Sequence, residues 1–119
     1  QKILINRHQI LVEIASNPLS QAQGLSGRES LPKNQGMLFV YQTSAIRPFW
    51  MNQMRFNLDF VFIKNNQVVD LLENVPFPQS GERPVVVKAK KPFDQILELN
   101  AGIIKNLGIK VGQEVKMLK

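Results

Sequence analysis

The sequence predicts a mostly β fold, either an antiparallel β-sandwich or a distorted barrel, carrying two short α-helices. Three observations predict it. Apolar residues recur at every second position in several short segments, and clusters of turn-forming residues separate these segments. The chain has 119 residues, of which 44% are apolar, which suits one domain spanning residues 1–119 with a core of its own.

The first elements are expected near the N-terminus. Residues 9–16 alternate between apolar and polar side chains, which indicates a half-buried strand. Asn17 followed by Pro18 is typical of a helix N-cap with proline in the first turn, so a short helix is expected over 18–26. Three apolar residues are expected on its inner side, Leu19, Ala22 and Leu25.

The clearest local prediction is a β-hairpin in the middle of the chain. Residues 58–63 alternate, with Asp59 facing opposite to the apolar set Leu58, Phe60 and Phe62. The turn contains Asn65-Asn66, and asparagine tolerates the positive φ that tight hairpin turns require. Other strands are expected at 37–41, from 49, and at 68–75, 85–87, 93–99 and 111–118. Asn100 is expected to cap a helix over 101–107, and three prolines make 76–84 an irregular loop.

Charge and composition narrow the function only in part. Fifteen basic residues against nine acidic ones give a formal net charge of +6, which favours anionic partners. Nucleic acid is not the favoured partner, because only Lys88, Lys90 and Lys91 cluster. The chain lacks cysteine, which excludes disulfides, thiolate metal sites and a cysteine nucleophile. No apolar run is long enough for a transmembrane helix, and no cofactor is expected.

An ordered set of short segments resembles a known family. It begins with Gly24-Leu25-Ser26-Gly27-Arg28 and Leu31-Pro32, and continues through 36–40, 49–51 and 58–63. It ends with 97–102 and 108–112. In this order and spacing the segments resemble the domain-of-unknown-function 192 family over residues 10–117. No single segment is specific, but the ordered set is.

The resemblance implies a compact, mostly antiparallel β domain, with no assigned reaction. Many members follow a signal peptide or lipid anchor, so export or anchoring through a removed leader is one expectation and the cytoplasm is the other. In one stretch the sequence departs from the family. After Phe-Trp-Met the family usually has Lys-Asn-Thr and later Pro-Leu-Asp, whereas this chain has Asn52-Gln53-Met54 and Asn57-Leu58-Asp59. If that polar triplet takes part in chemistry in other members of the family, the resemblance does not extend that chemistry to this chain.

Five residues are candidates for ligand binding. Asp59 and Glu98 are carboxyls within apolar strands, and such groups are either solvated, paired with a base such as Arg28 or Arg55, or functional. Arg28 could grip a carboxylate or phosphate, although a structural pair with Asp59 or Glu29 is the favoured interpretation. The last two candidates are Trp50 and Asn52.

Trp50, with the nearby amide Asn52, could form a platform for a sugar or peptide, although a core role for the indole is favoured. His8 is the only histidine, so neither a zinc site nor a catalytic triad is expected. No catalytic residue is assigned.

Three hypotheses for function follow. The first is a non-enzymatic binding or accessory domain outside the cytoplasm, for a small molecule or protein, with a groove lined by Arg28, Trp50, Asn52 and Asp59. The second is a hydrolase-like enzyme with Asp59 and Glu98 in one pocket, about 5 to 10 Å apart. The third is a basic nucleic-acid-binding barrel. The sequence favours the first and leaves the ligand and the oligomeric state open.

Overall fold

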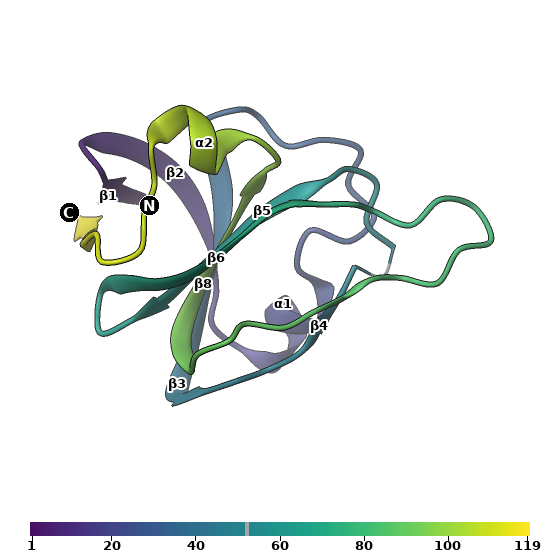
Figure 1. Ribbon diagram of the computed structural model, residues 1–119, viewed down its shortest axis with the longest axis horizontal. Coiled ribbons are helices and arrows are strands. Elements are labelled where there is room, and N and C mark those ends of the chain that lie inside the picture. Colours follow the sequence, from purple (N-terminus) through teal and green to yellow (C-terminus); the bar gives the residue numbers. More distant parts are fainter. Residues whose placement is uncertain (52) are drawn as a thin grey trace.

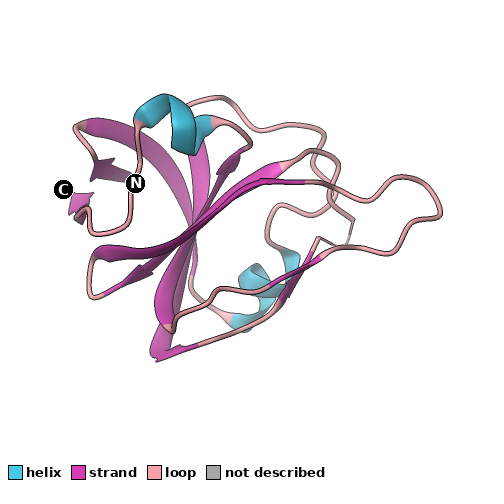
Figure 2. Cartoon of the chain, viewed as in Figure 1, coloured by secondary structure: helices cyan, strands magenta, loops and turns pink. Residues whose placement is uncertain are grey.

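The protein is a mostly β structure, which confirms the predicted fold class (Figures 1 and 2). The structure is a computed structural model that describes residues 1–51 and 53–119, with Trp50 described by its backbone alone. This part of the chain forms nine strands and two short helices. Their bounds are β1 (Lys2–Ile5), β2 (His8–Ala15), α1 (Pro18–Gln23), β3 (Gln35–Ala45), β4 (Phe49–Trp50), β5 (Leu58–Lys64), β6 (Gln67–Val75), β7 (Val86–Val87), β8 (Phe93–Asn100), α2 (Ile103–Leu107) and β9 (Val115–Leu118).

Seven of these strands form one curled sheet in the order β6-β5-β8-β3-β2-β1-β9. Neighbouring strands are antiparallel, except that β2 and β3 run parallel, with α1 in the connection between them. The sheet curls far enough for its two edges to touch at one corner, where Gln67 bridges to Glu114. There the Val68 amide donates to the Gln113 carbonyl at 2.9 Å, and the Gly112 amide donates to the Val68 carbonyl at 2.8 Å. The result is a half-barrel, with β4 and β7 paired outside it.

The sheet has an apolar cluster on each face. One cluster includes Ile103 and Ile104 of α2, which lies over that face (Figure 1). The other cluster packs under α1, the β4 segment and the loops around them. The predicted alternation in β5 is confirmed, because Leu58, Phe60 and Phe62 belong to the second cluster, whereas Val61 and Ile63 belong to the first.

The hairpin turn between β5 and β6 is also as predicted. Asn65 and Asn66 have φ of 50° and 62°, the left-handed region that asparagine tolerates. Strand β1 was not predicted. It pairs with both β2 and β9 and buries Ile3 and Ile5 completely, but its turn at Asn6-Arg7 lacks the glycine that usually marks such a hairpin.

Helix α1 is shorter than predicted and buries none of its own residues. Asn17 caps it as expected, since its Oδ1 accepts from the Ser20 amide at 2.9 Å. The predicted inner side is wrong for two of its three residues: Leu19 is 79% exposed and Ala22 is exposed, whereas Leu25 is buried just beyond the helix. The helix ends at Gly24, and only the chain that follows it turns into the core.

Helix α2 also departs from prediction at its start. It begins at Ile103 with Gly102 as N-cap, and Asn100 does not cap it. The Asn100 Nδ2 instead donates to the Leu31 carbonyl at 2.6 Å, which ties β8 to the loop before β3. Gly108 ends the helix at φ 64°, as expected. The last predicted strand is shorter than 111–118, because Gly112 at φ 97° belongs to a turn.

Candidate functional site

A row of side chains across the sheet places Glu98 in the centre of one face. In this row Glu13 of β2 lies beside Met37 of β3, Met37 beside Glu98 of β8, and Glu98 beside Phe60 of β5. Directly paired residues on neighbouring strands point to the same face. Glu98 therefore faces the side of the sheet that α1 and the β4 segment cover.

A small cavity lies above Glu98. Its volume is about 60 Å³. The sheet supplies Phe39, Leu58 and Phe60 beneath it, while α1, the chain after it and the segment after β4 supply the rest. The lining is mostly apolar, and Glu98 is its one ionisable residue among the residues that the structure describes. Its other lining residues are Gln21, Ala22, Gln23, Gly24, Leu25, Ser26, Phe49, Met51 and Met54.

A wider cleft of about 500 Å³ adjoins this cavity. The two share Gln21, Ala22, Gln23, Ser26 and Phe49, so the helix and the start of β4 flank both. Pro48 and Gln53 complete the described lining of the outer cleft. Together they form a site with neutral polar side chains at its rim and a carboxyl at its inner end. We call the two together the Glu98 cleft.

The Glu98 carboxyl lies in an apolar environment. The residue is only 7% exposed, and desolvation by burial raises the pKa of its carboxyl to about 8. No hydrogen bond or ion pair among the residues 1–51 and 53–119 involves this carboxyl. At neutral pH the group is therefore mostly protonated, and it offers one O–H donor beside one carbonyl acceptor.

Gln21 is held in a fixed position at the side of the cleft. Its Nε2 donates to the Val40 carbonyl at 2.7 Å and to the Ala15 carbonyl at 3.3 Å. These bonds attach α1 to β2 and β3, and they use only the donor end of the Gln21 amide, whose carbonyl oxygen accepts no hydrogen bond from the described residues. The helix, although short and exposed, is thereby anchored over the cavity.

Asp59 does not belong to this site, which corrects its placement in the predicted groove. It follows Leu58 in β5 and points to the opposite face from Glu98, with no exposed surface. Its carboxyl accepts the backbone amides of Asn74 at 2.8 Å, Gly102 at 3.0 Å and Ile104 at 2.9 Å. Asp59 therefore caps α2 from a neighbouring strand, which is a structural role.

The shared pocket required by a two-carboxylate hydrolase is therefore absent. Asp59 and Glu98 lie on adjacent strands, but the sheet itself separates their side chains. The alternation of side chains along a strand is the physical reason, because Asp59 neighbours Phe60 and Phe60 pairs with Glu98.

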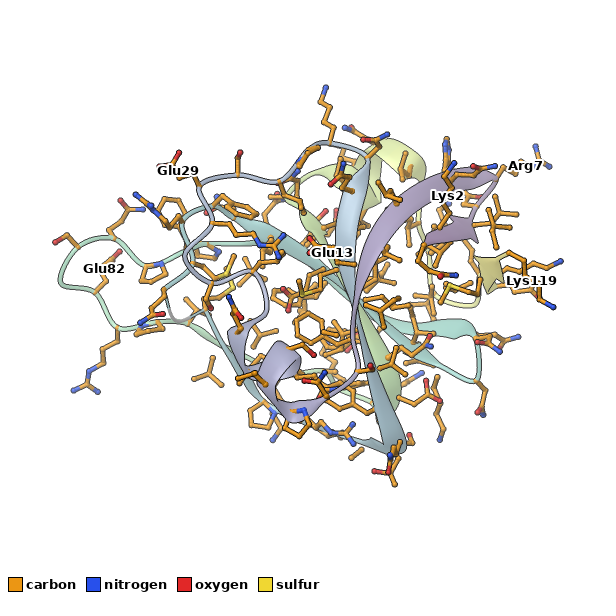
Figure 3. All side chains as sticks on the ribbon, turned by 180° about the vertical axis from the view of Figure 1, so that it is seen from behind. Lys2, Arg7, Glu13, Glu29, Glu82 and Lys119 are labelled. Carbon is orange, nitrogen blue, oxygen red and sulfur yellow. The ribbon has the colours of Figure 1, made fainter. Side chains whose placement is uncertain are left out.

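Arg28 also has a different partner from those predicted. It forms a two-pronged ion pair with Glu13, in which Nη2 lies 3.0 Å from Oε1 and Nη1 contacts Oε2. The hydrogen bond from Arg28 lowers the pKa of the Glu13 carboxyl, and the same bond raises the pKa of Arg28. Arg28 does not line the cleft. Figure 3 shows Glu13 near the middle of the molecule, away from Lys2, Arg7 and Lys119 at one end.

Two predicted site residues are beyond what the structure describes. Asn52 lies outside the described residues, and Trp50 is placed only as a backbone position in β4, paired with Val86. Their neighbours Phe49 and Met51 line the Glu98 cleft. The site therefore keeps Glu98 from the predicted set, while Gln21, Phe39 and Met54 were missed because nothing in their local sequence marks them.

Neither helix of the described chain is long and apolar enough to cross a membrane. Within residues 1–51 and 53–119 there is also no group of three or more His, Cys, Asp or Glu residues placed to hold a metal ion.

A protein-family model matches nearly the whole chain. The model of DUF192, described as an uncharacterized ACR, matches residues 2–117. The chain belongs to the DUF192 family. No curated protein matches this DUF192 chain.

Two crystal structures are similar to this DUF192 protein over nearly its whole length. One is a proposed transcription regulator from Sinorhizobium meliloti 1021, with 28% identity and a TM-score of 0.83 over 97% of this chain and 89% of the other. The second is a protein of unknown function from Novosphingobium aromaticivorans DSM 12444. It has 29% identity and a TM-score of 0.86 over 98% of this chain and 84% of the other.

Proposed function

We propose that this DUF192 protein is a non-enzymatic binding domain whose ligand enters the Glu98 cleft and reaches the Glu98 carboxyl. One observation supports this above all: a carboxyl that is only 7% exposed lines a cavity and has no partner among the described residues. No polar side-chain atom of the described residues is both fully buried and without a hydrogen-bond partner, so the oxygens of Glu98 reach the cavity and are not enclosed in the core. A polar group at the inner end of apolar walls is typical of a ligand site, because a ligand can pair with it there.

The lining of the cleft favours binding over catalysis. Glu98 is the one ionisable group in the described lining, and Asp59, the second carboxyl that the sequence proposed, lies behind the sheet. General acid–base chemistry with two carboxyls needs both groups at the reacting bond. Apolar walls with a few placed polar groups are instead typical of ligand sites.

A pair of matched variants on α1 tests the proposal. Ala22 lines both the cavity and the outer cleft, so Ala22→Phe should obstruct the cleft. Leu19 lies on the same helix, is 79% exposed and does not line the cleft, so Leu19→Phe is the control. Both positions are exposed, and neither substitution should unfold the chain.

Methionine methyl NMR provides the measurement. The methyls of Met51 and Met54 line the cavity, whereas Met117 lies on the edge strand β9 and serves as reference. We expect phenylacetamide, 2-phenylethylammonium or phenylacetate to shift the Met51 and Met54 signals but not that of Met117. The shifts should persist in Leu19→Phe and disappear in Ala22→Phe. Shifts that survive Ala22→Phe, or no shift with any probe, would contradict the proposal.

A second candidate function is nucleic-acid binding. It is supported by the net charge of +6, by the exposure of Lys88, Lys90 and Lys91, and by the description of the Sinorhizobium meliloti protein as a proposed transcription regulator. Binding to duplex DNA should weaken steeply with added salt, because phosphate contacts release counterions. A filter-binding assay in low salt that retains no DNA would dismiss this candidate.

A further inference from the structure

We propose that the Glu98 cleft selects an uncharged small molecule that presents a carboxamide-like group to Glu98 and rests an apolar body against Pro48 and Phe49 of the outer cleft. This inference rests on the proposed function and names the chemistry of its ligand. It is argued from the groups that line the cavity, from the sizes of the two spaces and from the hydrogen-bonding pattern of a protonated carboxyl.

The side chains that line the cleft disfavour charged ligands. Apart from Glu98, the described polar side chains of the cleft are the neutral Gln21, Gln23, Ser26 and Gln53. An anionic group would find no cationic partner among them. A cationic group would have to ionise Glu98 within apolar walls and would also approach a protein of net charge +6.

The hydrogen-bonding pattern of the Glu98 carboxyl determines which ligand group can pair with it. In its protonated form it has an O–H donor next to a carbonyl acceptor. A carboxamide has the reverse pair, a carbonyl acceptor beside an N–H donor, so two parallel hydrogen bonds can form. Gln21 lines the same cavity and is held in place by the bonds of its Nε2 to Val40 and Ala15, so its carbonyl oxygen can accept the second N–H of the amide.

The sizes of the two spaces divide the ligand into a head and a body. The cavity at Glu98 is about 60 Å³, against about 500 Å³ for the outer cleft. Only the end of a ligand therefore reaches Glu98. Phe39, Phe60 and Met54 enclose the head, and Phe49 and Pro48 lie along the path of the body.

Few other charged or titratable groups face Glu98. Tyr41 lies on the same face of β3, and burial raises the pKa of its hydroxyl to about 12, so it stays neutral. The Arg47 guanidinium stacks over the Tyr41 ring, 4.1 Å from its centre. At the end of the row across the sheet, Glu13 is neutralised by Arg28. Glu98 therefore controls the response of the cleft to pH.

The test compares three probes with the same phenyl body and different head groups: phenylacetamide, 2-phenylethylammonium and phenylacetate. Each is titrated into the intact chain while the Met51 and Met54 methyl signals are followed. At about pH 6.5 phenylacetamide should bind at least about tenfold more tightly than either ion. At about pH 9 its affinity should fall about tenfold, because only about one molecule in eleven still carries the Glu98 proton.

Two variants at Glu98 distinguish the contribution of its carboxyl to binding from that of the cavity around it. Glu98→Gln keeps a donor beside an acceptor and does not titrate, so phenylacetamide should bind equally at both pH values. Glu98→Met keeps the length of the side chain and removes both polar atoms, so it should reduce the affinity at least about tenfold at low pH. An apolar side chain in this apolar cavity should leave the fold intact.

The outcomes distinguish this inference from the proposed function. Tighter binding of the ammonium probe, with affinity that rises toward pH 8, would overturn the amide inference and keep the binding function. Unchanged amide affinity in Glu98→Met would do the same, since the carboxyl would then not be contacted. If no probe shifts Met51 and Met54, both proposals fall.

Discussion

Two carboxyls in similar sequence contexts have opposite roles in this protein. Asp59 and Glu98 each lie between apolar residues in adjacent strands of one sheet. Asp59 accepts three backbone amides and stabilises the start of α2. Glu98 has apolar neighbours and no partner in the described chain, so burial alone sets its state. The two carboxyls differ in role because backbone amides donate hydrogen bonds to Asp59, whereas no described donor reaches Glu98.

Stability should depend on pH through Glu98. Its carboxyl has a pKa of about 8 in the folded protein against an ordinary value of 4.5, so the folded state holds a proton that the unfolded state has lost between these values. Its contribution to the free energy of unfolding should therefore fall as the pH rises from 4.5 to about 8, by up to about 5 kcal/mol. Urea unfolding at several pH values measures this fall.

Glu98→Gln is the control for that measurement. Because the amide does not titrate, the variant should lose this part of the pH dependence while other groups keep theirs. A direct NMR titration of the Glu98 carboxyl is the second readout. A midpoint near 4.5 would show that the cavity does not desolvate the group.

At the scale of single elements, the turns of two hairpins use the same backbone conformation with different residues. The turn between β5 and β6 has Asn65-Asn66, whereas the turn between β1 and β2 has Asn6-Arg7, with φ of 45° and 67°. Asparagine occupies the left-handed region at little cost, but arginine does not. Asn6 also donates from Nδ2 to the carbonyls of Leu107 and Gly108, which joins this turn to the end of α2.

Glycine substitutions in that turn should therefore have opposite effects. Arg7→Gly relieves the strain at φ 67°, and the free energy of unfolding should stay equal or rise by up to about 1 kcal/mol. Asn6→Gly removes two hydrogen bonds to α2 and should lower it by about 1 kcal/mol or more. Chemical denaturation of both variants measures the difference. If both variants change the free energy of unfolding equally, neither strain at Arg7 nor the hydrogen bonds of Asn6 contribute to stability.

The whole molecule is held together by a sheet that almost closes on itself. Three backbone hydrogen bonds join its edges, from the amides of Val68, Gly112 and Val115 to carbonyls on the other side of the gap. The pairing of β1 with β9, in which Lys2 lies beside Leu118, brings the chain ends together on one side of the sheet (Figure 1). These bonds link residues far apart in the sequence, so only the complete fold can form them.

Hydrogen exchange tests whether this closure belongs to the cooperative unit. The amides of Val68, Gly112 and Val115 should exchange only with global unfolding, at the same free energy as Leu97 in the middle of the sheet. The Glu82 amide, bonded within the loop between β6 and β7, should exchange far faster and is the control. If the amides of Val68, Gly112 and Val115 exchange as fast as the Glu82 amide, the two edges of the sheet separate in the native state.

Local sequence patterns predicted most elements because their causes are local. Alternation placed the side chains of β5 on their correct faces, Asn17 and Pro18 gave the start of α1, and Asn65-Asn66 gave the hairpin turn. Local patterns failed where a distant residue decides, as at α2. Its cap comes from Asp59 and not from the adjacent Asn100.

The candidate site shows the same limit. The sequence marked Glu98 as a carboxyl within an apolar strand, and the structure places it in the lining of the cleft. It placed Asp59 and Arg28 in the same groove, but strand alternation puts Asp59 behind the sheet, and a pair with Glu13 takes Arg28.

By itself the sequence determined the β-rich class, the hairpin and the family resemblance, because periodicity, turn chemistry and ordered segments need no knowledge of distant contacts. Only the tertiary structure decided the parallel pairing of β2 with β3, the closing corner of the sheet and the cleft over Glu98. Each of these depends on which strands become neighbours. The free energy of burial fixes that choice through contacts between segments far apart in the chain, which local patterns do not contain.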